Sequence, residues 1–191
     1  STPALIHLSD AWDAAGGDAN AGLGARIGTM EGGQVEHPWF RDEGMPDPPA
    51  GFPRAQLIGR NATYDYPDAS LFTNRKLVGA YLIVETAETT MLTSTTSTPS
   101  LCPLSVTCNS SASHGAHVMG TATGRWDEYE FTVGPERLRR RMGGIAPMAE
   151  LFTYRNLDGT LGMVTGIEQM VKDGIDAFNA SLGSSIWLTG S

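Results

Sequence analysis

One continuous apolar run limits the folds open to this sequence. The eight residues Leu77–Val84 are all apolar or glycine, and Lys76 and Glu85 bound them on either side. A run of strand length without polar alternation is typical of a strand that is covered on both faces. We therefore expect Leu77–Val84 at the centre of a sheet.

Further strands and turns are predicted after residue 125. The segment Trp126–Val133 alternates, with Tyr129, Phe131 and Val133 on one face, and this period of two predicts a half-buried strand. A short helix is expected to begin at Gly134-Pro135-Glu136 and to end at Gly143-Gly144. The segment 150–164 favours a hairpin, because Asn156-Leu157-Asp158-Gly159 supplies turn residues that tolerate positive φ.

The most strongly patterned helix lies near the C-terminal end of the sequence. Thr165 and Glu168 match a capping box, and Gly183 stands where a C-cap glycine is expected. Between them an apolar stripe recurs at helical spacing: Ile167, Met170, Val171, Ile175, Phe178 and Leu182. We expect this stripe to pack on the Leu77–Val84 strand in one core.

Together these elements predict a single α+β domain over residues 1–191. We expect a mixed or antiparallel sheet, a long C-terminal amphipathic helix and extended Gly/Pro-rich loops. Segment 33–60 contains five prolines between Pro38 and Pro53, so we expect an extended surface through which no helix or interior strand runs. Segment 86–100 is rich in Thr and Ser and is expected to be a loop.

The charge of the chain narrows its partners. Thirteen Lys and Arg against 21 Asp and Glu give a formal net charge of -8, which opposes general binding to nucleic acid. The negative net charge is compatible with a basic or a neutral partner. The apolar run Leu77–Val84 is too short to cross a bilayer, so no membrane span is expected.

Two features point to a secreted protein or one at a cell or particle surface. Cys102 and Cys108 bracket five residues, a spacing that fits a small disulfide loop and matches no metal or redox motif. Reduced thiols in a cytosolic protein are the alternative. Asn61, Asn109 and Asn179 each begin a sequon for N-glycosylation.

The most chemical-looking local motif is His114-Gly115-Ala116-His117. Two imidazoles three residues apart can reach one metal ion if a turn or helix brings them together, although no third ligand is nearby in the sequence. Ser113 beside His114 also suggests a nucleophile. Catalytic triads, however, are assembled from distant segments, and the sequence has no Gly-x-Ser-x-Gly elbow. The alternative is a solvated loop with two ordinary histidines.

Two segments are candidates for binding a partner. Arg137, Arg139, Arg140 and Arg141 fall within five residues and form a basic patch on an acidic chain. Such a patch could bind phosphate, sulfate or an acidic neighbour, or simply promote solubility. In segment 33–60, Trp39 and Phe40 are expected to anchor a partner, because large aromatic side chains bury the most area.

No cofactor can be named from these patterns, and they favour two functions. The first is a non-catalytic binding or assembly module that joins a protein partner or a second copy of itself, since no acid, base and nucleophile cluster in the sequence. The alternative is a hydrolytic or metal-assisted enzyme with a site around His114 and His117.

Overall fold

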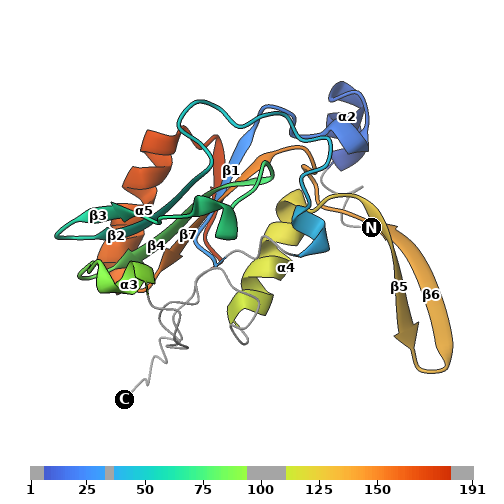
Figure 1. The fold of residues 1–191 in the computed structure, drawn as a ribbon. Helices are drawn as coiled ribbons and strands as arrows, with labels where there is room; N and C mark the ends of the chain where they lie inside the picture. The colour runs from blue at the N-terminus through green and yellow to red at the C-terminus, as the bar shows by residue number, and fades with distance from the viewer. Residues whose placement is uncertain (1–6, 33–36, 94–110, 182–191) are drawn as a thin grey trace, which may run out of the picture.

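The structure is a computed structural model that describes residues 7–32, 37–93 and 111–181. Its elements form one α+β domain with a mixed sheet of six strands, as the sequence predicts (Figure 1). A separate two-stranded sheet, which the sequence does not predict, accompanies it. The helices are α2 (Leu8–Ala14), α3 (Thr90–Thr93), α4 (Ser111–Thr123) and α5 (Gly159–Asp173). Three single 3-10 turns are η1 (Asp18–Asn20), η2 (Pro38–Phe40) and η3 (Ala69–Leu71).

The large sheet has the strand order β3-β2-β4-β7-β1-β8. Only β3 runs antiparallel to its neighbour; all the other neighbours are parallel. The bounds are β1 (Arg26–Thr29), β2 (Arg54–Gly59), β3 (Thr63–Asp65), β4 (Leu77–Val84), β7 (Glu150–Asn156) and β8 (Ala177–Asn179). Because five strands run the same way, their carboxyl ends meet at one edge of the sheet, where α/β proteins usually bind ligands.

The predicted central strand is confirmed as β4, which lies between β2 and β7 and is buried on both faces. On one face Tyr81 and Ile83 share a core with Met170 of α5. On the other face Leu77 packs with Met119 of α4 and with Phe40. This two-sided cover explains why the strand carries no polar alternation.

The C-terminal helix is confirmed, but it begins and ends earlier than predicted. Helix α5 ends at Asp173, and Gly174 adopts a left-handed φ of 68° as its C-cap. Gly174 therefore takes the role that was predicted for Gly183, which lies outside the described residues. Phe178 lies in β8 and is 54% exposed, so its predicted place on a buried helical stripe is wrong.

Two predictions around α5 and β6 are also wrong. The predicted hairpin over 150–164 is instead β7 followed by α5, because Asn156 and Asp158 form the turn from strand to helix: the Asn156 carboxamide oxygen accepts the Asp158 amide. The helix predicted after Gly134 is strand β6 (Glu136–Met142). It pairs antiparallel with β5 (Asp127–Val133), and we call this two-stranded hairpin, residues 127–142, the ribbon.

The proline-rich segment 33–60 contains an interior strand, contrary to prediction. Strand β2 occupies Arg54–Gly59 between β3 and β4, directly after the last proline of the segment, Pro53. The prolines themselves lie in η2 and in irregular chain before β2, as their missing amide donors require. The Thr/Ser-rich segment includes α3 at Thr90–Thr93, and its remainder from residue 94 lies outside the described residues.

Candidate functional site

A carboxylate and an imidazole meet at the carboxyl edge of the parallel strands. Glu31 follows the end of β1, and its Oε1 lies 3.1 Å from Nδ1 of His114, near the start of α4. The Glu31 side chain is only 9% exposed, whereas the His114 side chain is 55% exposed. The pair therefore joins a buried carboxylate to an imidazole that is open to solvent on its other side.

Strand β1 fixes the position of Glu31. It pairs in parallel with β7 on one side and with β8 on the other. Beyond the strand, the Met30 amide donates to the Asn179 carbonyl at 3.0 Å, so the chain stays tied to the sheet up to Glu31. The carboxylate thus lies two residues beyond a paired strand, and the sheet limits how far it can move.

Gly115 explains how α4 brings His114 so close. A Cβ built on Gly115 would lie 2.5 Å from the carbonyl oxygen of Gly32 and 3.2 Å from the Cβ of Glu31. Only a glycine allows this approach of helix to loop. Ala116 and Met119 then anchor the helix by packing in the core beside Leu77. The glycine between the two histidines therefore has a structural task.

The contact between Glu31 and His114 is an ion-pair contact by distance rather than a well-aligned hydrogen bond. The Glu31 Oε1 atom is buried and has no regular hydrogen bond within the described residues. In ligand-free sites catalytic hydrogen bonds are often poorly aligned and tighten when substrate binds. The imidazole of His114 is thus the group placed to donate a hydrogen bond to the buried Oε1 atom of Glu31.

The charge of Glu31 also acts on the guanidinium of Arg155. Arg155, near the end of β7, has its pKa lowered below the usual range by burial, and the negative charge of Glu31 opposes that shift. The carboxylate of Glu31 therefore lies within electrostatic reach of a guanidinium as well as an imidazole.

The predicted partner of His114 was His117, and the structure pairs His114 with Glu31 instead. His117 is exposed one turn further along α4, where its backbone carbonyl accepts the Thr121 hydroxyl at 2.9 Å. Within residues 7–32, 37–93 and 111–181, no group of three or more His, Cys, Asp or Glu side chains could hold a metal ion. The predicted metal site therefore finds no third ligand in this part of the chain.

Glu31 is not among the site residues that the sequence predicts. The short stretch Ile27–Met30 that leads to it lies among many glycines, which hide the pattern of a strand. Strand β1 has only four residues and ends at Thr29, two residues before Glu31, so its pattern is too short to mark the carboxylate. Its pairing with a histidine far along the chain leaves no mark in the sequence.

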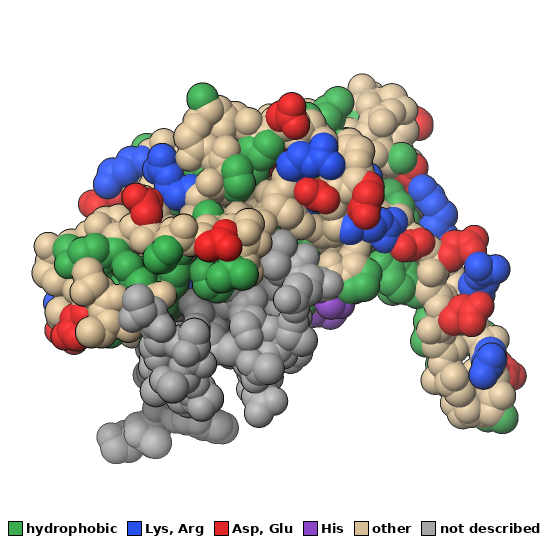
Figure 2. Space-filling view, viewed as in Figure 1, with side chains coloured by type: hydrophobic (Ala, Val, Ile, Leu, Met, Phe, Trp, Pro, Cys, Tyr) green, Lys and Arg blue, Asp and Glu red, His purple; other side chains and the backbone are tan. Residues whose placement is uncertain are grey.

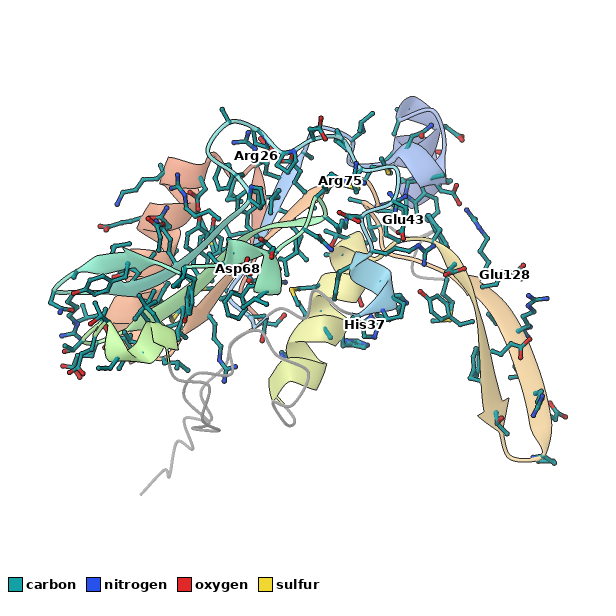
Figure 3. All side chains as sticks on the ribbon, in the orientation of Figure 1. Arg26, His37, Glu43, Asp68, Arg75 and Glu128 are labelled. Atoms are coloured by element: carbon teal, nitrogen blue, oxygen red, sulfur yellow. The ribbon has the colours of Figure 1, made fainter. Side chains whose placement is uncertain are left out.

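The predicted basic patch lies on β6 and is partly neutralised by nearby carboxylates. Arg139 pairs with Glu128 at 2.9 Å, and Arg141 pairs with Asp18 at 2.8 Å while its guanidinium stacks over Trp126. Figure 3 shows Glu128 on the ribbon, directed away from the body of the domain. Arg137 and Arg140 are exposed on the same strand.

The two aromatic residues predicted to anchor a partner belong to the core of the domain. Phe40 is fully buried, in a cluster with Leu77 and Met119, and Trp39 packs against the same cluster. A Cβ on Gly120 of α4 would overlap the Trp39 ring, which shows how closely the ring lies on the helix. The prediction that Phe40 presents its ring to a partner is therefore wrong.

The remaining predicted sites are described in part. Cys102, Cys108 and Asn109 lie outside the described residues. The Asn61 carboxamide bonds the backbone of Ala87 twice, donating to its carbonyl and accepting from its amide, so a glycan there would disrupt this pair. Asn179 is exposed on β8, and its carboxamide oxygen accepts the Ser181 hydroxyl.

A search against protein-family models found no family model that matches the chain. Within the described residues, no helix combines the length and the apolar character needed to cross a membrane.

The close approach at Gly115 gives a first prediction. Gly115→Ala should push α4 away from Gly32 and separate His114 from Glu31, because a backbone carbonyl cannot move aside as a flexible side chain can. We expect the ¹⁵N shifts of the His114 ring to show that the Nδ1–H tautomer is no longer favoured. We also expect the unfolding free energy to fall by about 1–3 kcal/mol. Gly120→Ala, which overpacks the same helix against Trp39, is the matched control.

In the control, the unfolding free energy should fall while the His114 ring shifts stay as in the wild type. If both variants leave the His114 tautomer unchanged, the close contact at Gly115 does not position the histidine.

Proposed function

We propose that this chain carries the carboxylate–histidine pair of a hydrolase that acts through a nucleophilic side chain on acyl compounds such as peptides or esters. The contact between the buried Glu31 and the exposed His114 at the carboxyl edge of the sheet supports this proposal. A carboxylate on Nδ1 fixes the tautomer that leaves Nε2 free to accept a proton. The pair is thus arranged as a general base held by its orienting group.

In the proposed reaction, Nε2 of His114 takes the proton from a hydroxyl or thiol as its oxygen or sulfur attacks the carbonyl carbon. Glu31 stabilises the imidazolium that forms and is not itself protonated. The imidazolium then gives the proton to the leaving amine or alcohol as the acyl bond breaks. Water repeats the sequence on the acyl-enzyme, and the nucleophile regains its proton.

The nucleophile is expected from another segment of the protein. Within the described residues, no serine, threonine or cysteine side chain forms a hydrogen bond with His114, whose side-chain contact is with Glu31. In this chain the carboxylate precedes the histidine. Triads of the subtilisin type, which also stand on an α/β scaffold, have this order, and their nucleophile comes third.

A labelling experiment tests this function. The full-length protein should react with a fluorophosphonate if the nucleophile is a serine, or with iodoacetamide if it is a cysteine, and peptide mass mapping should then identify one labelled residue. His114→Ala should lower the labelling rate at least about a hundredfold, because the general base is lost. His117→Ala, on the same helix and also exposed to solvent, should label at the wild-type rate.

Equal labelling of the wild type and His114→Ala would contradict the proposal, and so would an equal loss in both histidine variants. If neither reagent labels the protein and no ester or peptide is hydrolysed, the chain has no such activity. The binding or assembly function would then stand alone, and the exposed ribbon favours it as the second candidate. The predicted secreted or surface location stays a prediction.

A further inference from the structure

The ribbon is the part of the domain with the least cover. Its two strands pair only with each other within the described residues, so each has a free edge of backbone donors and acceptors. Figure 2 shows the ribbon standing away from the body of the domain, with a hollow between them. An isolated two-stranded hairpin is marginal in water, so this ribbon gains stability from any strand that joins it.

Apolar side chains gather on one face of the ribbon. Register pairs Phe131 with Leu138, and Tyr129 and Val133 lie on the same face. Tyr129 meets Trp39 of the body edge to face at 6.0 Å, so this face is directed toward the body. Farther out, Phe131 is 40% exposed and Val133 is 56% exposed.

The two strands carry opposite charge. Strand β5 holds the carboxylates Asp127, Glu128 and Glu130, whereas β6 holds four arginines. Arg139 contacts both Glu128 and Glu130, at 2.9 Å and 3.8 Å, so one guanidinium serves two carboxylates on the face opposite the apolar one. Arg41 of the body pairs with Asp127, so β5 keeps its surplus negative charge at Glu128 and Glu130, which share one guanidinium. Strand β6 keeps positive charge at Arg137 and Arg140.

We propose that the free edge of β5 binds an extended, basic polypeptide segment as an added strand. Backbone hydrogen bonds would hold the segment, and its alternate side chains would lie beside Phe131 and Val133 on the apolar face. The remaining side chains, if lysine or arginine, would meet Glu128 and Glu130. The net charge of -8 attracts a basic chain over longer range, and the arginines of β6 keep the same chain from the other edge.

This proposal does not rest on the carboxylate–histidine pair. The residues that carry it lie on the ribbon, and an acid–base role for His114 adds nothing to the argument. Loss of hydrolysis in a Glu31 or His114 variant should therefore leave the binding of the segment unchanged. The two proposals can fail separately.

Fluorescence anisotropy with two labelled ten-residue peptides tests the proposal on the full-length protein. One peptide alternates valine and lysine, and the other alternates valine and glutamate. At low salt the valine–lysine peptide should bind at least about tenfold tighter, and its binding should weaken as salt rises. Methylation of its alternate backbone amides on the pairing edge should weaken binding by a further factor of about ten.

Variants of the ribbon complete the test. The double variant Phe131→Ser and Val133→Ser should weaken the valine–lysine peptide about tenfold, and both positions are exposed enough to tolerate serine. Glu130→Gln should remove most of the preference over the valine–glutamate peptide. Arg137→Gln on the opposite strand is the matched control and should bind as the wild type does.

Three outcomes would overturn the proposal. Equal affinity for the two peptides would show that the bound segment need not be basic. Wild-type affinity in the double serine variant would show that the peptide does not bind at the ribbon. The third is self-association without peptide that the same variants abolish, since that would assign the apolar face to a second copy of the chain.

Discussion

Replacing Glu31 by glutamine is expected to lower kcat/KM for an ester or peptide about ten-thousandfold. Glutamine keeps the size of the side chain but can offer its amide N–H to Nδ1 of His114, from which the carboxylate now lies 3.1 Å. The ring would then carry its proton on Nε2, and the atom that must accept the proton of the nucleophile would be blocked. Steady-state kinetics of the full-length protein measure the effect.

Two controls separate this chemical role from a structural one. The melting temperature of Glu31→Gln should stay close to that of the wild type, because the substitution leaves the volume of a side chain that is 9% exposed nearly unchanged. Glu31→Asp should retain part of the activity, since a carboxylate remains although its reach is shorter. A decrease in kcat/KM below about tenfold in the glutamine variant would show that Glu31 does not orient the histidine.

Features with a local cause could be predicted from the sequence. The buried strand β4 follows from a side-chain pattern within eight residues and is confirmed. Strand β5 is confirmed as a strand, but its predicted half-burial is wrong, because Phe131 and Val133 are exposed on the ribbon. The boundaries of α5 were predicted too late in the sequence, because the apolar spacing continues past Gly174, the glycine at which the helix ends. Val171 is 77% exposed and Met170 is 3% exposed, so the apolar stripe did not reveal its buried side.

Only one of the two residues of the candidate site, His114, could be predicted from the sequence. His114 drew attention through its neighbours His117 and Gly115, and these are local in the sequence. Its partner Glu31 depends on the order of strands, since the parallel pairing of β1 with β7 and β8 decides which edge the carboxylate reaches. A sequence pattern carries no information on that order, so the pairing became visible only in three dimensions.

Lys76 is a second group whose role the sequence concealed. It was interpreted as a charge that bounds strand β4, yet it is fully buried, and its Nζ donates to the carbonyls of Pro147 and Ala149 at 2.9 Å and 2.6 Å. Lys76 thus ties the start of β4 to the chain that leads into β7. A lysine in the interior must either be paired or give up its charge.

We expect Lys76→Ala to lower the unfolding free energy by about 4 kcal/mol or more, because it opens a cavity and leaves two buried carbonyls without a donor. Urea denaturation measures the loss. Arg75→Ala, at the neighbouring half-exposed position with an ion pair to Asp42, is the matched control and should lose about 1 kcal/mol or less. Comparable losses in the two variants would mean that the bonds of Lys76 contribute little.

The same lysine should make the stability of the protein depend on pH. Burial, together with the nearby charge of Arg125, lowers the pKa of Lys76 to about 7 from its ordinary value of 10.5. Between these two values the unfolded chain binds a proton that the folded chain releases, so the unfolding free energy should rise with pH. A neutral amine keeps two N–H donors, enough for both carbonyls.

From pH 7 to pH 9 the increase should be roughly 2 kcal/mol, since each pH unit inside the window contributes at most about 1.4 kcal/mol. The rise should stop above the ordinary pKa of lysine, where both states are neutral. Burial raises the pKa of Tyr66 to about 12, so that tyrosine lowers the unfolding free energy only above about pH 10, outside the interval from pH 7 to pH 9.

In Lys76→Met, which keeps the length of the side chain without the amine, the unfolding free energy should stay level over the same interval. A rise of equal size in the methionine variant would assign the pH dependence to another group and leave Lys76 charged in the fold.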